Sequence, residues 1–436
     1  MRKLCLSLIS VQLVLGAAAL IASQDAAAQR AGAGNDQQQE QETRRTPAMR
    51  EAVYQRLSEA QACAEMGDMQ CARDKLNQLS RMRDLNSYET AQMYYFEAYL
   101  AFEDENYDGA ITAYEKVLQQ PDLPISLEQN TMLSLAQLYA QQERYQEALS
   151  MLERWFQVTE MPGTTAYVLK AQIHYQLRQY EQGIPEILRA IELAREQGRD
   201  IEESWYQLLN VFYFELENYP KVIETLTFMV NNWPKKDYFI QLASIYGQEG
   251  QEERMTALYE AAYEAGWLTR GQELTTLAQM LLQAEAPYKA ARILEKGLSD
   301  GTIEKTEANW RLLSQAWQLA REDEKALPAL TEAASRSNDG ELDLMLAQSY
   351  ANLARWEECA DAARNAIRRG GLDRPDRANL LLGNCLAEMK DYPAARTAFE
   401  AALRDERSRS TAQQWLQYIQ DEQDRERQLR QAQGRG

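Results

Sequence analysis

The clearest hydrophobic pattern in the chain lies in residues 376–409, where two short amphipathic segments flank the turn 389–392. The small residues Gly383 and Ala395 allow two helices to approach closely, and larger apolar residues fill the space around the crossing. Pro393 suits the first turn of a helix, because its missing N–H has no intrahelical partner there. The pattern therefore predicts a packed helix-turn-helix unit, with apolar or small residues at helical spacing: Leu382, Gly383, Leu386, Ala395, Phe399, Ala402 and Leu403.

The same pattern recurs every 33 to 39 residues. Each copy has a small residue on its first helix and, twelve positions later, a small or apolar residue on its second helix. An aromatic residue three positions before the second member marks the turn into the second helix in units such as those of Tyr107, Tyr145 and Tyr392. About ten units are predicted, by the pairs Ala60/Ala72, Ala98/Ala110, Ala136/Ala148, Ala171/Gly183, Asn210/Val222, Ala243/Met255, Ala278/Ala290, Ser314/Ala326, Ala347/Cys359 and Gly383/Ala395.

Two pairs, Asn210/Val222 and Ala243/Met255, match poorly, so a strict pattern would miss the middle of the array. Spacings above 34 residues predict longer second helices or loops such as 119–124. Residues 410–436 begin with an apolar stripe that includes Trp415 and Ile419, and then become mostly charged. We expect a capping helix there, because a terminal repeat needs a covered inner face and a polar outer face, with fraying or disorder beyond Asp421.

This unit resembles the tetratricopeptide repeat, a helix-turn-helix of about 34 residues with Leu-Gly in its first helix and Ala, Phe and Ala in its second. The resemblance implies an all-α solenoid, a right-handed superhelix that grows by stacking and needs no single large core. We expect the array to occupy residues 48–409 of the 436-residue chain, with the capping helix and charged tail in 410–436.

The first 47 residues differ from the repeats. Arg2 and Lys3, the apolar run 4–22 and the Ala-Ala-Ala of residues 26–28 predict a signal peptide over 1–28. An uncleaved anchor is the alternative, since about 19 apolar residues could just span a bilayer. Residues 29–47 are too polar to offset their ordering entropy and are predicted to be a disordered linker. The mature protein is then expected in a periplasm, without a membrane span.

Composition narrows the function. The formal net charge of −19 makes nucleic acid an unlikely partner, because its phosphates require a basic face. The chain offers His174 as its single histidine, at a position where other units place an aromatic residue, so we interpret it as a core residue. No Gly-rich phosphate loop follows a strand pattern. We therefore predict no enzyme activity, no metal site and no cofactor.

Four cysteines remain after removal of Cys5 with the signal peptide. In an oxidising compartment an even number permits two disulfides. Cys63 and Cys71 flank the turn of a predicted hairpin and could pair, and Cys359 and Cys385 lie on successive helices. The alternative is that all four are small buried residues in place of alanine.

The first helices would line the concave surface of such an array, and they carry amides at fixed positions. Residues at i and i+4 share a helix face, so the amides would form two rows, and each amide offers both a donor and an acceptor to a peptide backbone. The alternative is that glutamine is simply a frequent exposed helix former. The predicted partner groove consists of Gln137, Gln172, Gln279, Gln315, Gln348 and Asn384 in one row and Gln141, Gln176, Gln248 and Gln283 in the other.

Aromatic residues distinguish the N-terminal part of this surface, where Tyr95 and Tyr99 are candidate anchors for a partner. Such aromatic clusters also serve as core. Basic residues that could hold a C-terminal carboxylate are missing from most units, and Arg311 and Arg377 are the two candidates.

Residues 53–430 are also similar to periplasmic tetratricopeptide proteins encoded beside TonB, ExbB and ExbD genes in gammaproteobacteria. The similarity is carried by LYAQQERYQEALSMLERWF, YQLLNVFYFELENYPKVIETLTFMV and WPKKDYFIQLASIYGQEG. It implies an interaction scaffold that assists TonB-dependent iron uptake through contact with TonB, ExbB or ExbD. The competing interpretation is an envelope assembly factor or chaperone for outer-membrane proteins or polysaccharide machinery, although the chain lacks the lipobox cysteine of a lipoprotein of that kind.

Overall fold

The computed structural model describes residues 48–433, which form 21 α-helices. The predicted signal peptide and the whole of the predicted linker lie outside the described residues. The chain divides into two compact units, one up to Thr225 and one from Leu226, and this boundary falls within α10. None of the helices in residues 48–433 combines the length and apolar character needed to cross a membrane.

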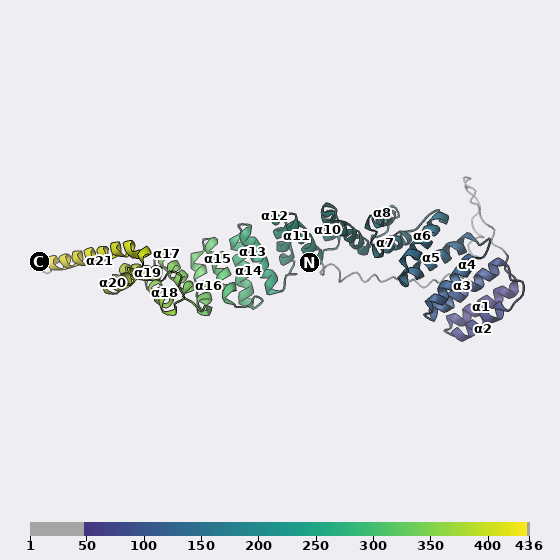
Figure 1. Cartoon of the computed structure of the whole chain (residues 1–436), viewed down its shortest axis with the longest axis horizontal. Helices are drawn as coiled ribbons and strands as arrows, with labels where there is room; N and C mark the ends of the chain where they lie inside the picture. The colour runs from purple at the N-terminus through teal and green to yellow at the C-terminus, as the bar shows by residue number, and fades with distance from the viewer. Residues whose placement is uncertain (1–47, 434–436) are drawn as a thin grey trace. The chain divides into compact units, whose positions relative to one another are not determined.

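In the first unit, consecutive helices pair as hairpins (Figure 1). The bounds are α1 Glu51–Glu65, α2 Met69–Ser80, α3 Ser87–Glu103, α4 Tyr107–Leu118, α5 Ile125–Gln141, α6 Tyr145–Val158, α7 Thr164–Gln176, α8 Tyr180–Glu196 and α9 Glu203–Glu215, with α10 Tyr219–Asn232 at the boundary.

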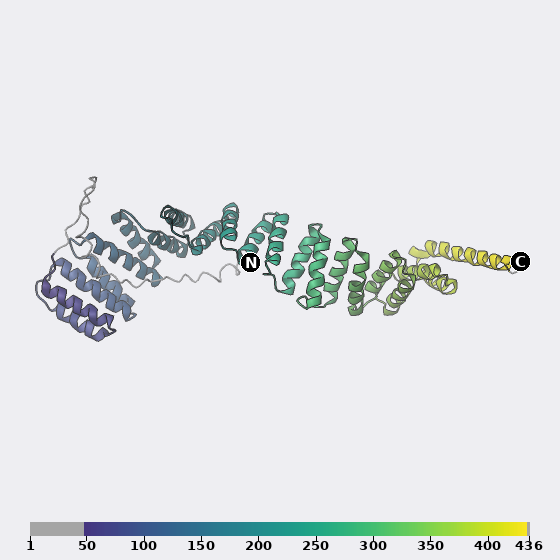
Figure 2. The ribbon, with the colours of Figure 1, turned by 180° about the vertical axis from the view of Figure 1, so that it is seen from behind.

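The second unit continues the pattern and ends in a long helix that runs on beyond the last hairpin (Figure 2). The bounds are α11 Lys236–Gln248, α12 Glu252–Glu264, α13 Gly271–Gln283, α14 Pro287–Asp300, α15 Glu307–Leu319, α16 Asp323–Arg336, α17 Glu341–Asn352, α18 Trp356–Arg369, α19 Pro375–Glu388, α20 Tyr392–Ala402 and α21 Glu406–Gln433. The predicted ten hairpins and final helix are confirmed.

The small residues that set the predicted register lie at the crossing of the two helices in each hairpin. In the last hairpin, a Cβ on Gly383 would come within 2.6 Å of the Phe399 ring. Between hairpins, a Cβ on Gly183 in α8 would overlap the ring of Phe212 in α9 of the next hairpin. Of the ten predicted pairs, all members are buried except Asn210 and Met255, which are half-buried and belong to the two poorly matching units.

Each hairpin turn contains a left-handed residue two positions before its second helix. The backbone N–H groups of Lys390 and Asp391 donate to Ala387 and Leu386, as in a Schellman turn. The second helix then begins at the aromatic residue that the sequence predicts in the hairpins of α4, α6, α8, α10, α18 and α20. The left-handed residues have φ between 54° and 78°, and they are Gly67, Glu105, Glu143, Arg178, Glu217, Gly250, Glu285, Arg321, Ala354 and Lys390.

The sequence predicts longer second helices or loops in the early units, and the structure shows longer loops but not longer second helices there. The extra length lies in the loops 81–86 and 119–124 and in the first helices α3 and α5, which have 17 residues each, whereas the second helices α2 and α4 have 12. A longer second helix is found at α8, with 17 residues.

The C-terminal helix α21 covers the last hairpin. Ala412 and Ile419 are fully buried, and the indole of Trp415 stacks on Phe399 with ring centroids 5.5 Å apart. The helix begins at Glu406 instead of Ser410, and the residues after Asp421, where fraying was expected, continue it. Ion pairs at i,i+3 spacing, such as Arg425–Glu422 at 3.1 Å, support this polar part.

Candidate functional site

The predicted amide rows lie on the surfaces of the first helices. Each residue of the first row follows a buried small residue, and a rotation of about 100° per residue turns it away from the second helix. None of the ten amide residues is buried: Gln137, Gln141, Gln172 and Asn384 are half-buried, and Gln176, Gln248, Gln279, Gln283, Gln315 and Gln348 are exposed.

The structure brings three of these amides together in the first unit. Gln141 at the end of α5 and Gln172 and Gln176 on α7 line a hollow of about 300 Å³. Buried Leu169 and Ile173 contribute an apolar floor. The three residues come from both predicted rows, so the hollow lies where the rows of two neighbouring hairpins meet.

One acceptor in this hollow lacks a partner. The side-chain oxygen Oε1 of Gln141 is shielded from solvent and accepts no hydrogen bond from any residue in 48–433. A buried acceptor without a donor is unfavourable by about 1–3 kcal/mol. Gln141 thus brings an amide whose oxygen lacks a donor to a hollow that two further amides line.

The end of α5 that carries Gln141 is held by polar contacts. The Tyr139 hydroxyl donates to Glu115 Oε1 at 2.6 Å, and the Arg144 guanidinium lies 4.5 Å from the centre of the Tyr139 ring. Burial and the neighbouring Glu115 carboxylate raise the pKa of Tyr139 to about 12, so it stays a donor at neutral pH. These contacts fix the α5 side of the hollow.

The two predicted aromatic anchors are half-buried. The ring of Tyr95 packs edge-on against Tyr114 of the second helix at 5.4 Å, and burial raises its pKa. The ring of Tyr99 lies 5.7 Å from that of buried Phe96. Part of the surface of both rings is therefore buried by packing within the unit, because α3 carries aromatic residues on several faces.

Other singled-out residues do not join the hollow. His174 is buried, with its Nδ1 2.9 Å from the side-chain oxygen of Gln179, as a core residue would be. Arg311 on α15 forms a 3.8 Å ion pair with Glu307 of its own helix. Arg377 is exposed on α19, two hairpins away from Arg311.

Disulfides join Cys63 to Cys71 and Cys359 to Cys385. The first links α1 to the beginning of α2, and the second links α18 to α19 of the next hairpin. The Cα atoms of the two pairs lie 5.7 Å and 6.1 Å apart, within the usual range for a disulfide.

Neighbouring hairpins are also joined by ion pairs near the start of their first helices. The sequence analysis did not single out the carboxylates of these pairs. Arg50 before α1 forms several hydrogen bonds to buried Glu89 in α3, including one of 2.6 Å, and holds the pKa of Glu89 at about 2. Lys236 in α11 likewise reaches Glu273 in α13 at 2.7 Å. The two partners of each pair are 37 to 39 residues apart in the sequence, which is about one repeat. A search for opposite charges at this spacing could have revealed these pairs.

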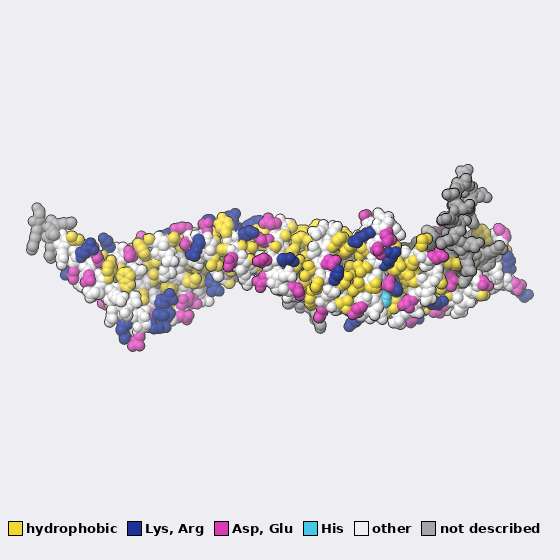
Figure 3. Space-filling model, turned by 90° about the horizontal axis from the view of Figure 1, so that it is seen from above, with side chains coloured by type: hydrophobic (Ala, Val, Ile, Leu, Met, Phe, Trp, Pro, Cys, Tyr) yellow, Lys and Arg dark blue, Asp and Glu magenta, His cyan; other side chains and the backbone are white. Residues whose placement is uncertain are grey.

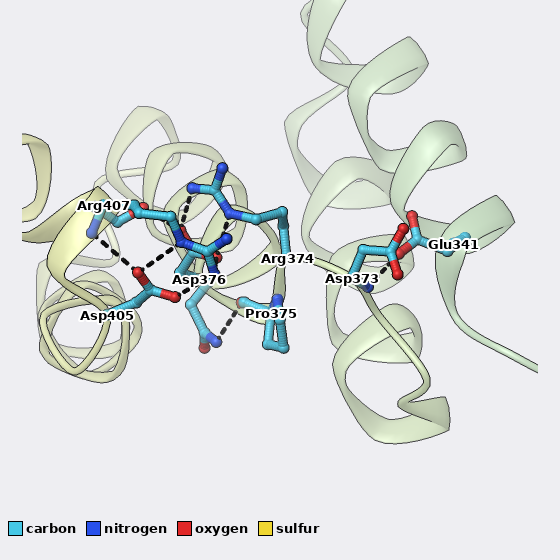
Figure 4. A network of polar contacts seen from close by, with 9 residues as sticks. Glu341, Asp373, Arg374, Pro375, Asp376, Asp405 and Arg407 are labelled. Atoms are coloured by element: carbon cyan, nitrogen blue, oxygen red, sulfur yellow. Dashed lines mark hydrogen bonds and ion pairs between the residues drawn. The ribbon is translucent and has the colours of Figure 1, made fainter.

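Figure 4 shows the corresponding network at the C-terminal end of the array. Buried Asp376 at the start of α19 accepts a 2.9 Å hydrogen bond from Arg374 Nε and a 2.5 Å hydrogen bond from the Ser408 hydroxyl of α21. Arg407 lies 3.8 Å away. The Arg374 hydrogen bonds outweigh burial and hold the pKa of Asp376 well below its usual range, so this carboxylate is charged at neutral pH.

Charges elsewhere are interspersed. On the face shown in Figure 3, acidic and basic side chains are scattered among hydrophobic and uncharged polar ones. The hollow between α5 and α7 has one acidic residue, Glu143, and no basic residue in its lining. Its chemistry is therefore that of amides above an apolar floor.

Comparisons with known proteins identify the repeat. A family model for the tetratricopeptide repeat matches residues 57–124 and 344–411. A second model, described as subunit 3 of the anaphase-promoting complex or cyclosome, matches residues 103–191. Residues 192–343, which include the two poorly matching units, lie outside these matches. None of the curated proteins compared with the chain matches it.

Solved structures with detectable similarity include several tetratricopeptide proteins. YrrB, a protein with an unusual peptide-binding site, is 17% identical, with 40% of this chain and 85% of that chain covered and a TM-score of 0.33. A repeat protein from Parabacteroides merdae is 14% identical, with 68% and 98% covered and a TM-score of 0.35. The TPR2AB domain of yeast Sti1 in complex with pHSP90 is 16% identical, with 67% and 98% covered and a TM-score of 0.24. The described residues thus form an array of helical hairpins that carries tetratricopeptide repeats in the two matched segments, residues 57–124 and 344–411.

Proposed function

We propose that this protein is a non-catalytic interaction scaffold that binds an extended peptide segment of a partner protein across α5 and α7. The observation that supports this most directly is the hollow lined by Gln141, Gln172 and Gln176, in which the Gln141 acceptor lacks a donor. Catalysis is not part of the proposal, because amides and apolar side chains make up most of the lining.

An extended backbone suits this hollow for two reasons. Its N–H and C=O groups alternate along the strand, so one N–H can donate to Gln141 Oε1 once that side chain turns toward the hollow, while other groups pair with the amides of Gln172 and Gln176. Its alternate side chains point to opposite faces, so one small apolar side chain can contact Leu169 and Ile173. The site would thus recognise backbone geometry more than sequence, with a preference for an uncharged segment.

We further propose that the protein works in a periplasm and assists a TonB-dependent iron-uptake system by holding a segment of TonB, ExbB or ExbD. The signal-peptide pattern in residues 1–28 and the similarity of residues 53–430 to proteins encoded beside TonB genes support this proposal. The competing role is that of an envelope assembly factor, and the partner bound in the hollow distinguishes the two roles.

The test is site-specific crosslinking in cells under iron limitation, with a photoreactive amino acid at position 172. The matched control carries the same group at Gln182, which is exposed on the second helix α8. Crosslinks from position 172 to TonB, ExbB, ExbD or a TonB-dependent receptor, without the same crosslinks from position 182, are expected. Crosslinks from position 172 to outer-membrane assembly components would refute the iron-uptake role and favour the alternative, and equal products from both positions would refute the site itself.

A further inference from the structure

A second cleft lies on the second-helix side of the C-terminal unit. It is formed by α12 and α14 of successive hairpins and has a volume of about 880 Å³, within the usual range for binding clefts. Buried Ile293 and half-buried Tyr263 form its apolar floor. This cleft uses second helices, whereas the proposed peptide site uses first helices, so it is independent of that site.

The cleft results from the unusual sequence of α12, whose hairpin contains the poorly matching pair Ala243/Met255. Within α12, Thr256 and Ala262 are the residues that the structure buries. Ala257 and Ala261 are exposed, so the surface of this helix carries methyl groups where other second helices carry larger side chains. Ala261 lines the cleft, and its small side chain leaves space between α12 and α14.

The two walls of the cleft have opposite charges. Glu260 and Glu264 lie on α12, whereas α14 carries Lys289, Arg292 and Lys296 and one acidic residue, Glu295, which pairs with Arg292 at 3.5 Å. One pair already bridges the cleft, because Lys289 Nζ contacts Glu260 Oε1 at 2.7 Å. This bridge sets the relative height of the two helices, so Glu264, one turn beyond Glu260, lies level with the part of α14 beyond Lys289.

An exposed aromatic residue stands at the mouth of the cleft. Tyr288 is 49% exposed, and its ring packs edge-on against buried Trp317 at 5.4 Å. Lys325 lies over both rings, 5.4 Å from the centre of Tyr288 and 4.9 Å from that of Trp317. A partly exposed aromatic that is held in place is a typical interface anchor, because little side-chain entropy is lost when it is covered.

We propose that this cleft is a self-association surface and that its occupant is a second copy of the chain. A two-fold axis that runs along the cleft, parallel to α12 and α14, places each α14 opposite the α12 of the other copy at the same height. Lys289 of each copy then faces Glu260 of the other, and the long side chain of Lys296, whose Cα lies about 4.5 Å further along the axis, can reach Glu264. The basic wall of each copy thus meets the acidic wall of the other copy, so the surface is self-complementary, as an isologous interface requires.

Charge also argues for a self-complementary contact at this place. The chain carries a net charge of −19, so two copies repel one another over most of their surface. Lys289 and Lys296 give each copy a basic strip beside the acidic edge of α12, since Arg292 is already paired with Glu295 of its own helix. Contact through this face offsets the repulsion with attraction at short range.

Sedimentation velocity on the mature protein tests the proposal. A concentration-dependent dimer is expected for the wild type at about 50 mM NaCl, weakened at least fivefold at about 500 mM because salt screens exposed charges. Lys296→Glu and Glu264→Lys should each weaken the dimer at least tenfold, because each places like charges opposite one another. Both positions are exposed, so unchanged thermal unfolding should show that the fold is intact.

The decisive sample is an equimolar mixture of the two single variants. In a mixed dimer both contacts again join opposite charges, so the mixture should dimerise within about threefold of wild-type affinity, although each variant alone does not. A wild type that stays monomeric throughout would overturn the proposal. A mixture no stronger than its components would overturn it as well, because the dimer would then form elsewhere.

Discussion

Replacing Asp376 by asparagine removes the charge that connects the start of α19 to the start of α21 (Figure 4). The carboxylate is buried and accepts hydrogen bonds from Arg374 and from the Ser408 hydroxyl. Asparagine keeps one acceptor oxygen but presents an NH₂ group toward Arg374 or Ser408. The substitution thus weakens the contact that fixes the capping helix, without changing side-chain volume.

The expected effect follows from the exposure of the partners. Removing one member of a fully buried ion pair is unfavourable by about 3–5 kcal/mol. The side chains of Arg374 and Arg407 are 33% and 56% exposed, so water can solvate them after the change and the loss should be smaller. We expect a loss of about 2 kcal/mol, which raises the equilibrium constant for opening α21 about 30-fold.

Hydrogen exchange read by mass spectrometry at neutral pH measures this opening locally. Amides in the first half of α21 should exchange about 30-fold faster in Asp376→Asn, because terminal units of a repeat array open without the whole array. The control is Asp373→Asn: its side chain is exposed, and the backbone N–H of residue 373 donates to Glu341 at 2.7 Å. Unchanged exchange in α21 of Asp376→Asn, or an equal increase in both variants, would refute the assigned role of Asp376.

Three further changes test other parts of the fold. Ala354→Gly should raise the free energy of unfolding by about 0.5 kcal/mol, since Ala354 has φ 56° and glycine adopts this conformation without strain; urea titration checks the sign. Gly383→Ala should lower it by about 1 kcal/mol because the new Cβ meets the Phe399 ring, and adding Phe399→Leu should recover part of the loss. Glu89, whose pKa Arg50 lowers from 4.5 to about 2, stabilises the fold above pH 4.5, and this contribution disappears as the pH falls toward 2. The free energy of unfolding of Glu89→Gln should therefore be about 2 kcal/mol lower than that of the wild type at pH 7, after allowance for the 45% exposure of Arg50. Below pH 2, acid titrations should give the same free energy of unfolding for both proteins.

The hairpins could be predicted from the sequence because their register depends on side-chain size at two positions. A residue such as Gly383 is required where a ring such as that of Phe399 crosses the helix, and that requirement leaves a periodic trace in the sequence. The aromatic residues that begin the second helices leave a similar trace. The turn residues do not, because eight of the ten left-handed positions in the hairpin turns carry a residue other than glycine.

The sites were less predictable, because they depend on how neighbouring hairpins meet. The amide rows gave ten candidates, but the hollow between α5 and α7 gathers Gln141, Gln172 and Gln176. The cleft between α12 and α14 arises from side chains that are smaller than usual, and a search for chemically active residues does not detect these. Asp376 bonds to residues two positions before it and 32 positions after it, and no local pattern connects the two.

The central claim is that α5 and α7 bind an extended peptide through their amides. Peptides selected on the wild-type protein from a displayed random library, with affinities then measured by titration calorimetry, test it most directly. Loss of one hydrogen bond at each of two residues predicts at least tenfold weaker binding by Gln172→Ala/Gln176→Ala. The control Gln315→Ala/Gln348→Ala, on exposed amides of the second unit, should bind as the wild type does. Wild-type affinity in the first double variant, or an equal loss in the control, would contradict the claim.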